Sequence, residues 1–253
     1  MSLFTLALTL GFVLIAILLS IWQKLGLEKD MAISTVRATV QLLIVGYILK
    51  AVFSLQDPLF TLLMIALMIG VATQNAKQRG AGLKGIGWRV LVSISLAEAV
   101  TLGFLLLLQI VPPEPRYIIP ISGMVIGNSM VIASLLLNRL QAEAKGRRQE
   151  ILLVLSLGGT PGQSIRHVLK EAIRASMIPT IDSMKTTGLV QLPGMMTGQI
   201  IAGADPIQAV RYQLMILFAI LAAAALTSIF LGFLAYPGFF NKHQQLVTGE
   251  SDP

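Results

Sequence analysis

The sequence predicts an all-α, polytopic helical membrane protein, and three observations support this prediction. Hydrophobic residues make up 55% of the 253-residue chain, and charged residues make up 12%. A soluble domain carries about 25% charged residues. Several uncharged runs are also long enough to span a bilayer, which takes about 20 helical residues. The third observation is that most basic residues lie in the connections between these runs, as the positive-inside rule describes.

About seven membrane-spanning helices are expected in chain order. The first lacks the basic start and the small-residue cleavage pattern of a signal peptide, so we expect it to remain as a span. The third and the sixth are the shortest. The expected spans are residues 3–23, 33–53, 58–74, 90–111, 117–138, 186–203 and 210–235.

The charges between the spans indicate how the chain crosses the membrane. The connections 24–37, 74–89 and 138–185, together with the tail, hold 16 of the 19 Lys and Arg residues. Because such residues accumulate in cytoplasmic loops, the N-terminus is predicted outside and the C-terminus inside. An odd number of spans requires the two termini to lie on opposite sides of the membrane, which agrees with this orientation.

The expected organisation is a transmembrane domain over residues 1–240 and a flexible polar tail over 241–253. The largest soluble part is the cytoplasmic segment 139–185, which is too small for a catalytic domain. Cytoplasmic loops explain the net charge of +7, so the lipid bilayer, and not nucleic acid, is the expected partner. The chain has no cysteine, which excludes disulfides, thiolate metal sites and cysteine nucleophiles.

The cytoplasmic segment contains a clear helix start. In Gly158-Gly159-Thr160-Pro161, Thr160 is a favourable N-cap and Pro161 suits the first helical position. Apolar residues then recur at helical spacing, while basic residues occupy another face. The apolar positions are Ile165, Val168, Leu169, Ala172 and Ile173, and the basic positions are Arg166, Lys170 and Arg174. A short basic helix between membrane spans suggests a docking element for a cytosolic partner.

Motifs for enzymatic chemistry are absent from the sequence. No stretch matches the phosphate-binding pattern G-x-x-x-x-G-K-[ST], and the glycine-rich residues 158–164 lack its lysine. The two histidines, His167 and His243, lie outside the expected spans. Neither a Gly-x-Ser-x-Gly nor a His-Glu-x-x-His motif occurs. The chain is therefore not expected to be an enzyme or to bind a cofactor, and the ligands of any metal site stay unknown.

A few polar residues within the spans are candidates for a translocation path. Glu98 lies in the fourth span, where a carboxylate costs about 2.5–3.5 kcal/mol. Arg37 and Gln41 share one face of the second span, and Arg37 lies at a depth comparable to that of Glu98. We expect Arg37 and Glu98 to pair or to share a water-filled cavity. This pair serves either as a substrate or ion pathway or as a structural ion pair between helices.

The fifth and sixth spans carry the remaining candidates. Asn128 follows Gly127, and a stripe of Gln191, Met195 and Gln199 runs beside the small residues of the sixth span. One interpretation is tight helix packing, which small residues four apart permit, at Gly123 and Gly127 and at Gly194, Gly198 and Ala202. The other is that these polar residues line the path. Methionines offer soft thioether ligands but more often fill apolar gaps.

Prolines mark expected kinks or breaks at residues 120, 179 and 193. After Pro179 we expect one helix to end and another to begin. Asp182 would then cap the N-terminus of the sixth span, where the helix dipole favours its charge.

Several segments resemble the YbbM/FetB family of membrane proteins. These segments are Ala38–Leu43, Gly123–Asn128, Ile181–Gly198 and Gly203–Pro206. The resemblance extends over nearly the whole chain except the tail. It implies a permease subunit of an ATP-binding-cassette (ABC) transporter, in a family whose bacterial members are linked to iron export and whose plant relatives are linked to aluminium tolerance. It further implies a homodimer in the bacterial cytoplasmic (inner) membrane, and a separate cytosolic ATPase that uses ATP and magnesium.

The same resemblance gives the Gly158–Arg174 segment the role of contacting the ATPase. The implied coupling residues are Gly158, Gly159, Thr160, Pro161, Gly162, Gln163, Arg166 and Lys170. The usual Glu-Ala-Ala start of an importer loop is replaced by Glu150-Ile151-Leu152. Three alternatives stay open, namely an ABC permease for a non-metal solute, an ATP-independent carrier or channel with Glu98 as its ion site, and a membrane scaffold.

Overall fold

The computed structural model describes residues 3–247 except residues 56, 81 and 84. The predicted all-α membrane fold is confirmed. Within the described residues, five helices are long and apolar enough to cross a membrane, and a shorter apolar helix covers Leu8–Trp22. The expected number of seven spans and the expected orientation stay predictions.

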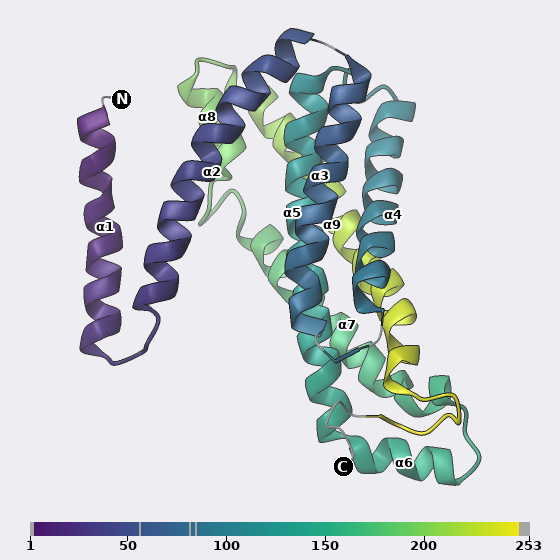
Figure 1. Ribbon diagram of the computed structural model, residues 1–253. Helices are drawn as coiled ribbons and strands as arrows, with labels where there is room; N and C mark the ends of the chain where they lie inside the picture. The colour runs from purple at the N-terminus through teal and green to yellow at the C-terminus, as the bar shows by residue number, and fades with distance from the viewer. Residues whose placement is uncertain (1–2, 56, 81, 84, 248–253) are drawn as a thin grey trace. The chain divides into compact units, whose positions relative to one another are not determined.

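The chain divides into two compact units, Met1–Asp57 and Pro58–Pro253. The first contains α1 (Leu3–Trp22) and α2 (Glu28–Leu55), which Figure 1 shows in purple and dark blue. Ser20 holds the turn between them, because its hydroxyl donates to the Glu28 carboxylate at 3.2 Å and accepts from the Leu27 amide at 3.3 Å. Most α2 side chains are exposed within the first unit.

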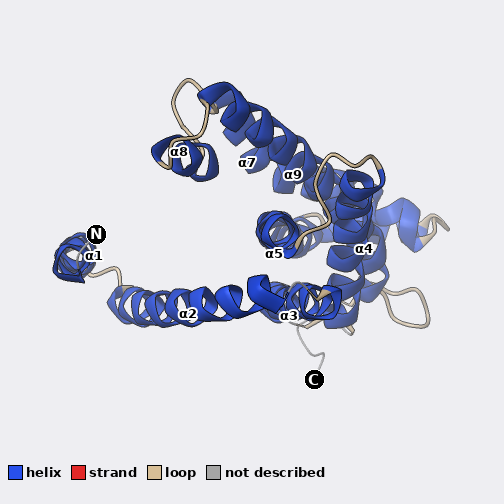
Figure 2. Ribbon diagram, turned by 90° about the horizontal axis from the view of Figure 1, so that it is seen from above, coloured by secondary structure: helices blue, strands red, loops and turns tan. Residues whose placement is uncertain are grey.

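The second unit is a bundle in which α5 contacts α3, α4, α7 and α9. Figure 2 shows α5 at its centre. The helices in order are α3 (Pro58–Lys77), η1 (Gln78–Gly80), α4 (Ile86–Leu107), α5 (Pro115–Gly146), α6 (Arg148–Ser156), α7 (Pro161–Thr186), α8 (Gly194–Ile201), α9 (Pro206–Ala235) and η2 (Tyr236–Phe239).

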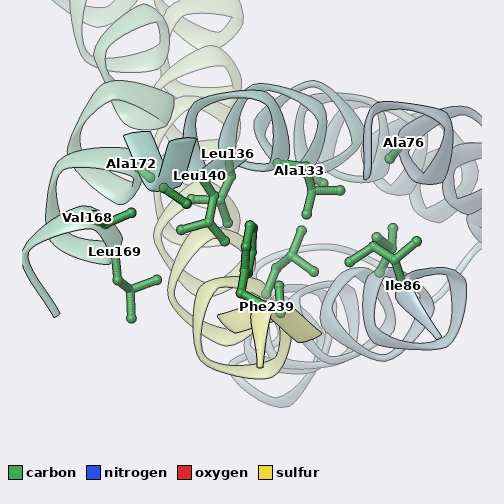
Figure 3. Close-up of a cluster of buried hydrophobic side chains, with 14 of the residues drawn as sticks. Ala76, Ile86, Ala133, Leu136, Leu140, Val168, Leu169, Ala172 and Phe239 are labelled. Atoms are coloured by element: carbon green, nitrogen blue, oxygen red, sulfur yellow. The ribbon is translucent and has the colours of Figure 1, made fainter. Parts of the chain in front are cut away.

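The main hydrophobic core joins the amphipathic start of α7 to the membrane helices. Val168, Leu169 and Ala172 of α7 are buried in one cluster with Leu136 and Leu140 of α5, as Figure 3 shows. Residues of α3, α4, α6, α9 and η2 complete this cluster. The helical spacing of apolar residues after Ile165 therefore correctly predicts the buried face of α7. This segment is packed into the bundle and is not a separate arm.

The sixth expected span, residues 186–203, is wrong as a continuous helix. α7 ends at Thr186, and α8 has eight residues, which rise about 12 Å at 1.5 Å per residue. Gly188 has a φ of +88°, and its amide donates to the Gln191 carbonyl at 2.9 Å in the intervening turn. Pro193 precedes the first residue of α8, so the predicted break at this proline is confirmed.

The expected helix end after Pro179 is also wrong. α7 continues through Pro179 for seven further residues, to Thr186. Asp182 lies inside the helix and not at an N-cap, and its carboxylate pairs with Lys185 at 2.9 Å. Pro120 likewise lies within the continuous α5. Packing of these helices against their neighbours offsets the loss of one hydrogen bond at each proline.

The tight packing expected at the small residues of the fifth and sixth spans is not found among the described residues. A Cβ atom added at Gly194, Gly198 or Gly127 meets no atom within 4 Å, and at Gly123 its nearest neighbour is 3.8 Å away. Close approach occurs instead at Gly232 of α9, where an added Cβ would lie 2.8 Å from Leu169 and 3.2 Å from Ile173. This glycine lets α9 pack against α7.

The predicted cap of α7 is confirmed and gives a stability prediction. The Thr160 hydroxyl accepts from the Gln163 amide at 3.3 Å, and the Gln163 side chain accepts from the Thr160 amide at 2.9 Å. We expect Thr160→Ala to lower the free energy of unfolding by about 1 kcal/mol, because an orphan amide loses its partner. Thermal unfolding in detergent measures this. Thr39→Ala, which removes a hydroxyl bonded inside a helix, should cost less, and an equal cost would contradict the capping role.

Candidate functional site

The turn between α6 and α7 has a fixed shape. Gly158 has a φ of +85°, in a region that favours glycine. The Gly159 amide donates to the Val154 carbonyl at 2.9 Å, and a Cβ at Gly159 would lie 2.8 Å from that same oxygen. Pro161 then opens α7 directly after the Thr160 cap. The first four predicted coupling residues are therefore brought together in one well-defined turn.

The outer surface of this element is apolar with basic residues beside it. Ile151 anchors α6 in the core, whereas Leu153 is 60% exposed and Leu157 is 79% exposed. Arg166 and Lys170 are exposed on α7. They line a cavity of about 400 Å³ together with Gly162, Ile165, Leu169, Ile173, Phe233 and Tyr236. All eight predicted coupling residues lie in the turn or within the first turns of α7.

The start of α6 is held by ion pairs. Arg147, between α5 and α6, contacts the carboxylates of Glu143 at 3.2 Å and Glu150 at 3.3 Å. The hydrogen bonds to Glu143 and then Glu150 raise the pKa of the Arg147 guanidinium. These bonds fix the direction in which α6 leaves the end of α5.

The predicted path residues fall into separate places. Arg37 and Gln41 lie exposed on α2 in the first unit, so their relation to Glu98 stays a prediction. Met195 and Gln199 of α8 line a cavity of about 300 Å³ between α5, α8 and α9. Gln191 is exposed in the turn before α8. The other residues lining this cavity are Val111, Arg116, Tyr117, Pro120, Ile121, Met124 and Tyr212.

Asn128 links α5 to α7. Its side-chain oxygen accepts from the Thr180 hydroxyl at 3.5 Å, and its amide nitrogen is buried without a partner in the described structure. The helix that begins at the Thr160 turn thus reaches a predicted path residue.

Glu98 is 3% exposed on α4. Neither carboxylate oxygen has a hydrogen-bond partner among the described residues. The Ser122 hydroxyl of α5 faces it, but the two groups do not complete a regular hydrogen bond. A buried unpaired carboxylate within a membrane helix is costly, which makes Glu98 a candidate functional residue.

A larger apolar cavity of about 580 Å³ lies between α4 and α9. Thr101, one helical turn from Glu98, lines it, and so does Arg211. The remaining lining residues are Val100, Phe104, Leu105, Ile110, Leu214, Met215, Phe218, Ala219 and Ala222. Within the described residues there is no group of three or more His, Cys, Asp or Glu side chains able to hold a metal ion.

The family assignment follows from comparison with known proteins. The model of the UPF0014 family, described as an uncharacterised protein family, matches residues 3–240. The chain belongs to the UPF0014 family. This confirms the resemblance that the Ile181–Gly198 segment and three shorter segments carry, since relatives in this family include the FetB protein.

Three UPF0014 relatives match nearly the full chain. The UPF0014 membrane protein YjkA of Bacillus subtilis is 57% identical over 99% of this chain and 100% of its own length. The probable iron export permease protein FetB of Escherichia coli is 43% identical over 96% of this chain and 94% of its own length. The protein ALUMINUM SENSITIVE 3 of Arabidopsis thaliana is 36% identical over 96% of this chain and 89% of its own length. No solved structure matches this UPF0014 chain.

Proposed function

We propose that this chain is the membrane-spanning permease subunit of an ABC transporter that exports iron or another metal ion. The observation that carries the proposal is the α6–α7 element, a rigid, capped turn that displays apolar and basic side chains beside a membrane bundle. The name of FetB as a probable iron export permease supports the same function. ATP and magnesium are used by a separate cytosolic ATPase, because the chain has no phosphate-binding loop.

The ATPase docks on α6 and the start of α7. Leu153 and Leu157 provide apolar anchors, and Arg166 and Lys170 flank the cavity beside them. Apolar side chains that enter pockets on a partner, with charges around them, are typical of the residues that dominate binding. The ion pairs of Arg147 and the Thr160 cap hold this surface in one shape before the ATPase binds.

Movement of the ATPase is transmitted through α7. This helix is continuous from Pro161 to Thr186, and its buried residues pack against α5 and α9. A push at its N-terminus therefore moves Thr180 against Asn128. In a homodimer with two ATPases in the cytoplasm, this displacement switches the bundle between inward-open and outward-open states. The protein then lies in the bacterial inner membrane with the α6–α7 turn inside the cell.

The test of this function is Leu157→Glu. The tagged protein is purified from its native membrane and assayed for co-purifying, vanadate-sensitive ATP hydrolysis and for metal transport in vesicles. We expect both activities to fall at least about tenfold, because a charge replaces an apolar anchor that a partner must desolvate. Leu25→Glu, a control in the turn after α1 where leucine is 58% exposed, should retain them. Unchanged ATP hydrolysis and transport in Leu157→Glu would refute the coupling role.

The buried Glu98 favours a second candidate function, an ATP-independent cation carrier or channel. In that case an ion gradient alone drives transport in vesicles, and the partner ATPase makes no difference. The same vesicle assay with and without ATP separates the two functions. An ABC permease for a non-metal solute predicts ATP-dependent transport that metal ions do not stimulate.

A further inference from the structure

The polar atoms within the bundle of the second unit are divided into two classes. Several buried hydroxyls donate to a carbonyl of their own helix, as Ser93 does to Arg89, Thr101 to Ala97 and Ser228 to Ala225. In contrast, the hydroxyls of Thr61, Thr73, Ser122, Ser129 and Thr227 are buried without any partner among the described residues, as are both oxygens of Glu98.

Glu98, Ser122 and Thr227 belong to three helices that contact each other, α4, α5 and α9. The Ser122 hydroxyl lies near the Glu98 carboxylate without completing a regular hydrogen bond. The position of Thr227 along the bundle, relative to Glu98, follows from the contacts between α4 and α9. Arg89 donates to the carbonyl of Ala235 at 3.2 Å, and Leu105 shares a cluster with Ala219, so α4 and α9 run in opposite directions. Glu98 follows Arg89 by nine residues and Thr227 precedes Ala235 by eight, which places them at the same level.

Charge compensation for Glu98 is lacking on the surrounding helices. Its side chain is 3% exposed, and those of Ser122 and Thr227 are 0% exposed. The charged residues of α3, α4, α5 and α9 are Lys77, Arg89, Arg116, Arg139, Glu143, Lys145 and Arg211. None of them hydrogen-bonds the Glu98 carboxylate. A buried carboxylate without a cation beside it is neutralised either by a proton or by a positive ion from outside the chain.

We propose that Glu98, Ser122 and Thr227 form a binding site for a hard divalent cation that keeps part of its water shell. One carboxylate and two hydroxyls are oxygen ligands, which suit hard cations, whereas soft cations prefer thioether sulfur. Because three protein ligands are fewer than such an ion requires, water supplies the rest. This inference deepens the proposed function, on which it rests for the role of the cation as cargo, by giving the class of cation and the place where it binds.

The structure also contains a soft alternative that serves as an internal control. Met124 and Met195 line the cavity between α5, α8 and α9. If cargo were bound by sulfur, these methionines would hold it and Glu98 would not. The two sites therefore predict opposite results for the same pair of variants.

The experiment measures binding of Mn²⁺ to the purified full-length protein in lipid nanodiscs, by loss of the electron paramagnetic resonance signal of free Mn²⁺. Glu98→Gln keeps the side-chain shape and is expected to weaken Mn²⁺ binding at least about tenfold. Ser122→Ala and Thr227→Val are expected to weaken it less. Glu143→Gln and the double variant Met124→Leu/Met195→Leu are expected to bind Mn²⁺ as the unchanged protein does.

A second measurement uses the unchanged protein, in case Glu98→Gln does not fold. Dicyclohexylcarbodiimide modifies carboxyl groups in apolar surroundings, and mass spectrometry locates the modified peptide. Mn²⁺ is expected to protect the peptide that contains Glu98. The proposal is overturned if Glu98→Gln binds Mn²⁺ normally, if Mn²⁺ gives no protection, or if only the methionine variant loses binding. Equilibrium binding requires neither ATP nor an ATPase, so its loss or retention is independent of the docking test with Leu157→Glu.

Discussion

Replacing Gly232 by leucine is expected to separate α7 from α9 and to destabilise the second unit by about 3 kcal/mol. A Cβ at this position already lies 2.8 Å from Leu169 and 3.2 Å from Ile173, so a full side chain has no room. Overpacking in a close-packed interior typically costs 1–3 kcal/mol, and more where neighbours cannot move. Thermal unfolding of the purified protein in detergent gives the size of the effect.

Gly103→Leu is the matched control for Gly232→Leu. Gly103 also lies inside a membrane helix, α4, but a Cβ there meets no atom within 4 Å. This control should unfold at a temperature close to that of the unchanged protein. If both variants lose the same stability, the cost comes from glycine replacement in a helix and not from the α7–α9 contact. Gly232→Leu should also reduce ATPase docking, because α7 is no longer held in place.

Single cysteine variants are expected to show an all-or-none difference in labelling across the membrane. The chain has no cysteine of its own, so each introduced thiol is the only target for a membrane-impermeant maleimide. Leu157→Cys lies in the α6–α7 turn, where leucine is 79% exposed. Ala204→Cys lies in the exposed connection before α9. In intact cells Ala204→Cys should react, and Leu157→Cys should react only after permeabilisation.

This pattern is expected because the basic residues around α6 and α7 keep that segment in the cytoplasm. The reverse pattern would place the α6–α7 turn outside the cell, beyond the reach of an ATPase, and the proposed transporter would be wrong. Labelling of both variants from one side would show that the chain crosses the membrane an even number of times, or not at all, between them. Denatured protein controls for thiols that are buried and not merely on the far side.

Local chemistry made the start of α7 predictable. Thr160, Pro161 and Gln163 act through bonds between residues three apart, so their effect can be read without knowing any neighbouring helix. The apolar stripe from Ile165 to Ala172 likewise carries its own period. The same reasoning failed at Pro179, because a proline can be tolerated inside a helix that is held by its neighbours, and no local pattern records those neighbours.

The candidate cation site could be predicted only in part. Glu98 stands out in the sequence because a carboxylate is rare in a membrane helix. Ser122 and Thr227 do not, since serine and threonine are common in such helices and many of them donate to their own backbone. Met195 and Gln199 line a cavity that neither Glu98 nor Asn128 lines, and their place on a translocation path stays a prediction.

By itself, the sequence determined that this protein is a helical membrane protein of the UPF0014 family, with a capped basic helix between its apolar helices. Hydropathy, charge distribution and capping are properties of single segments and need no partner. Only the tertiary structure decided that α7 packs into the bundle, that a turn and the short α8 replace the sixth span, and that Gly232 is the close contact. These features depend on distances between segments far apart in the chain, which van der Waals contact fixes and residue order does not.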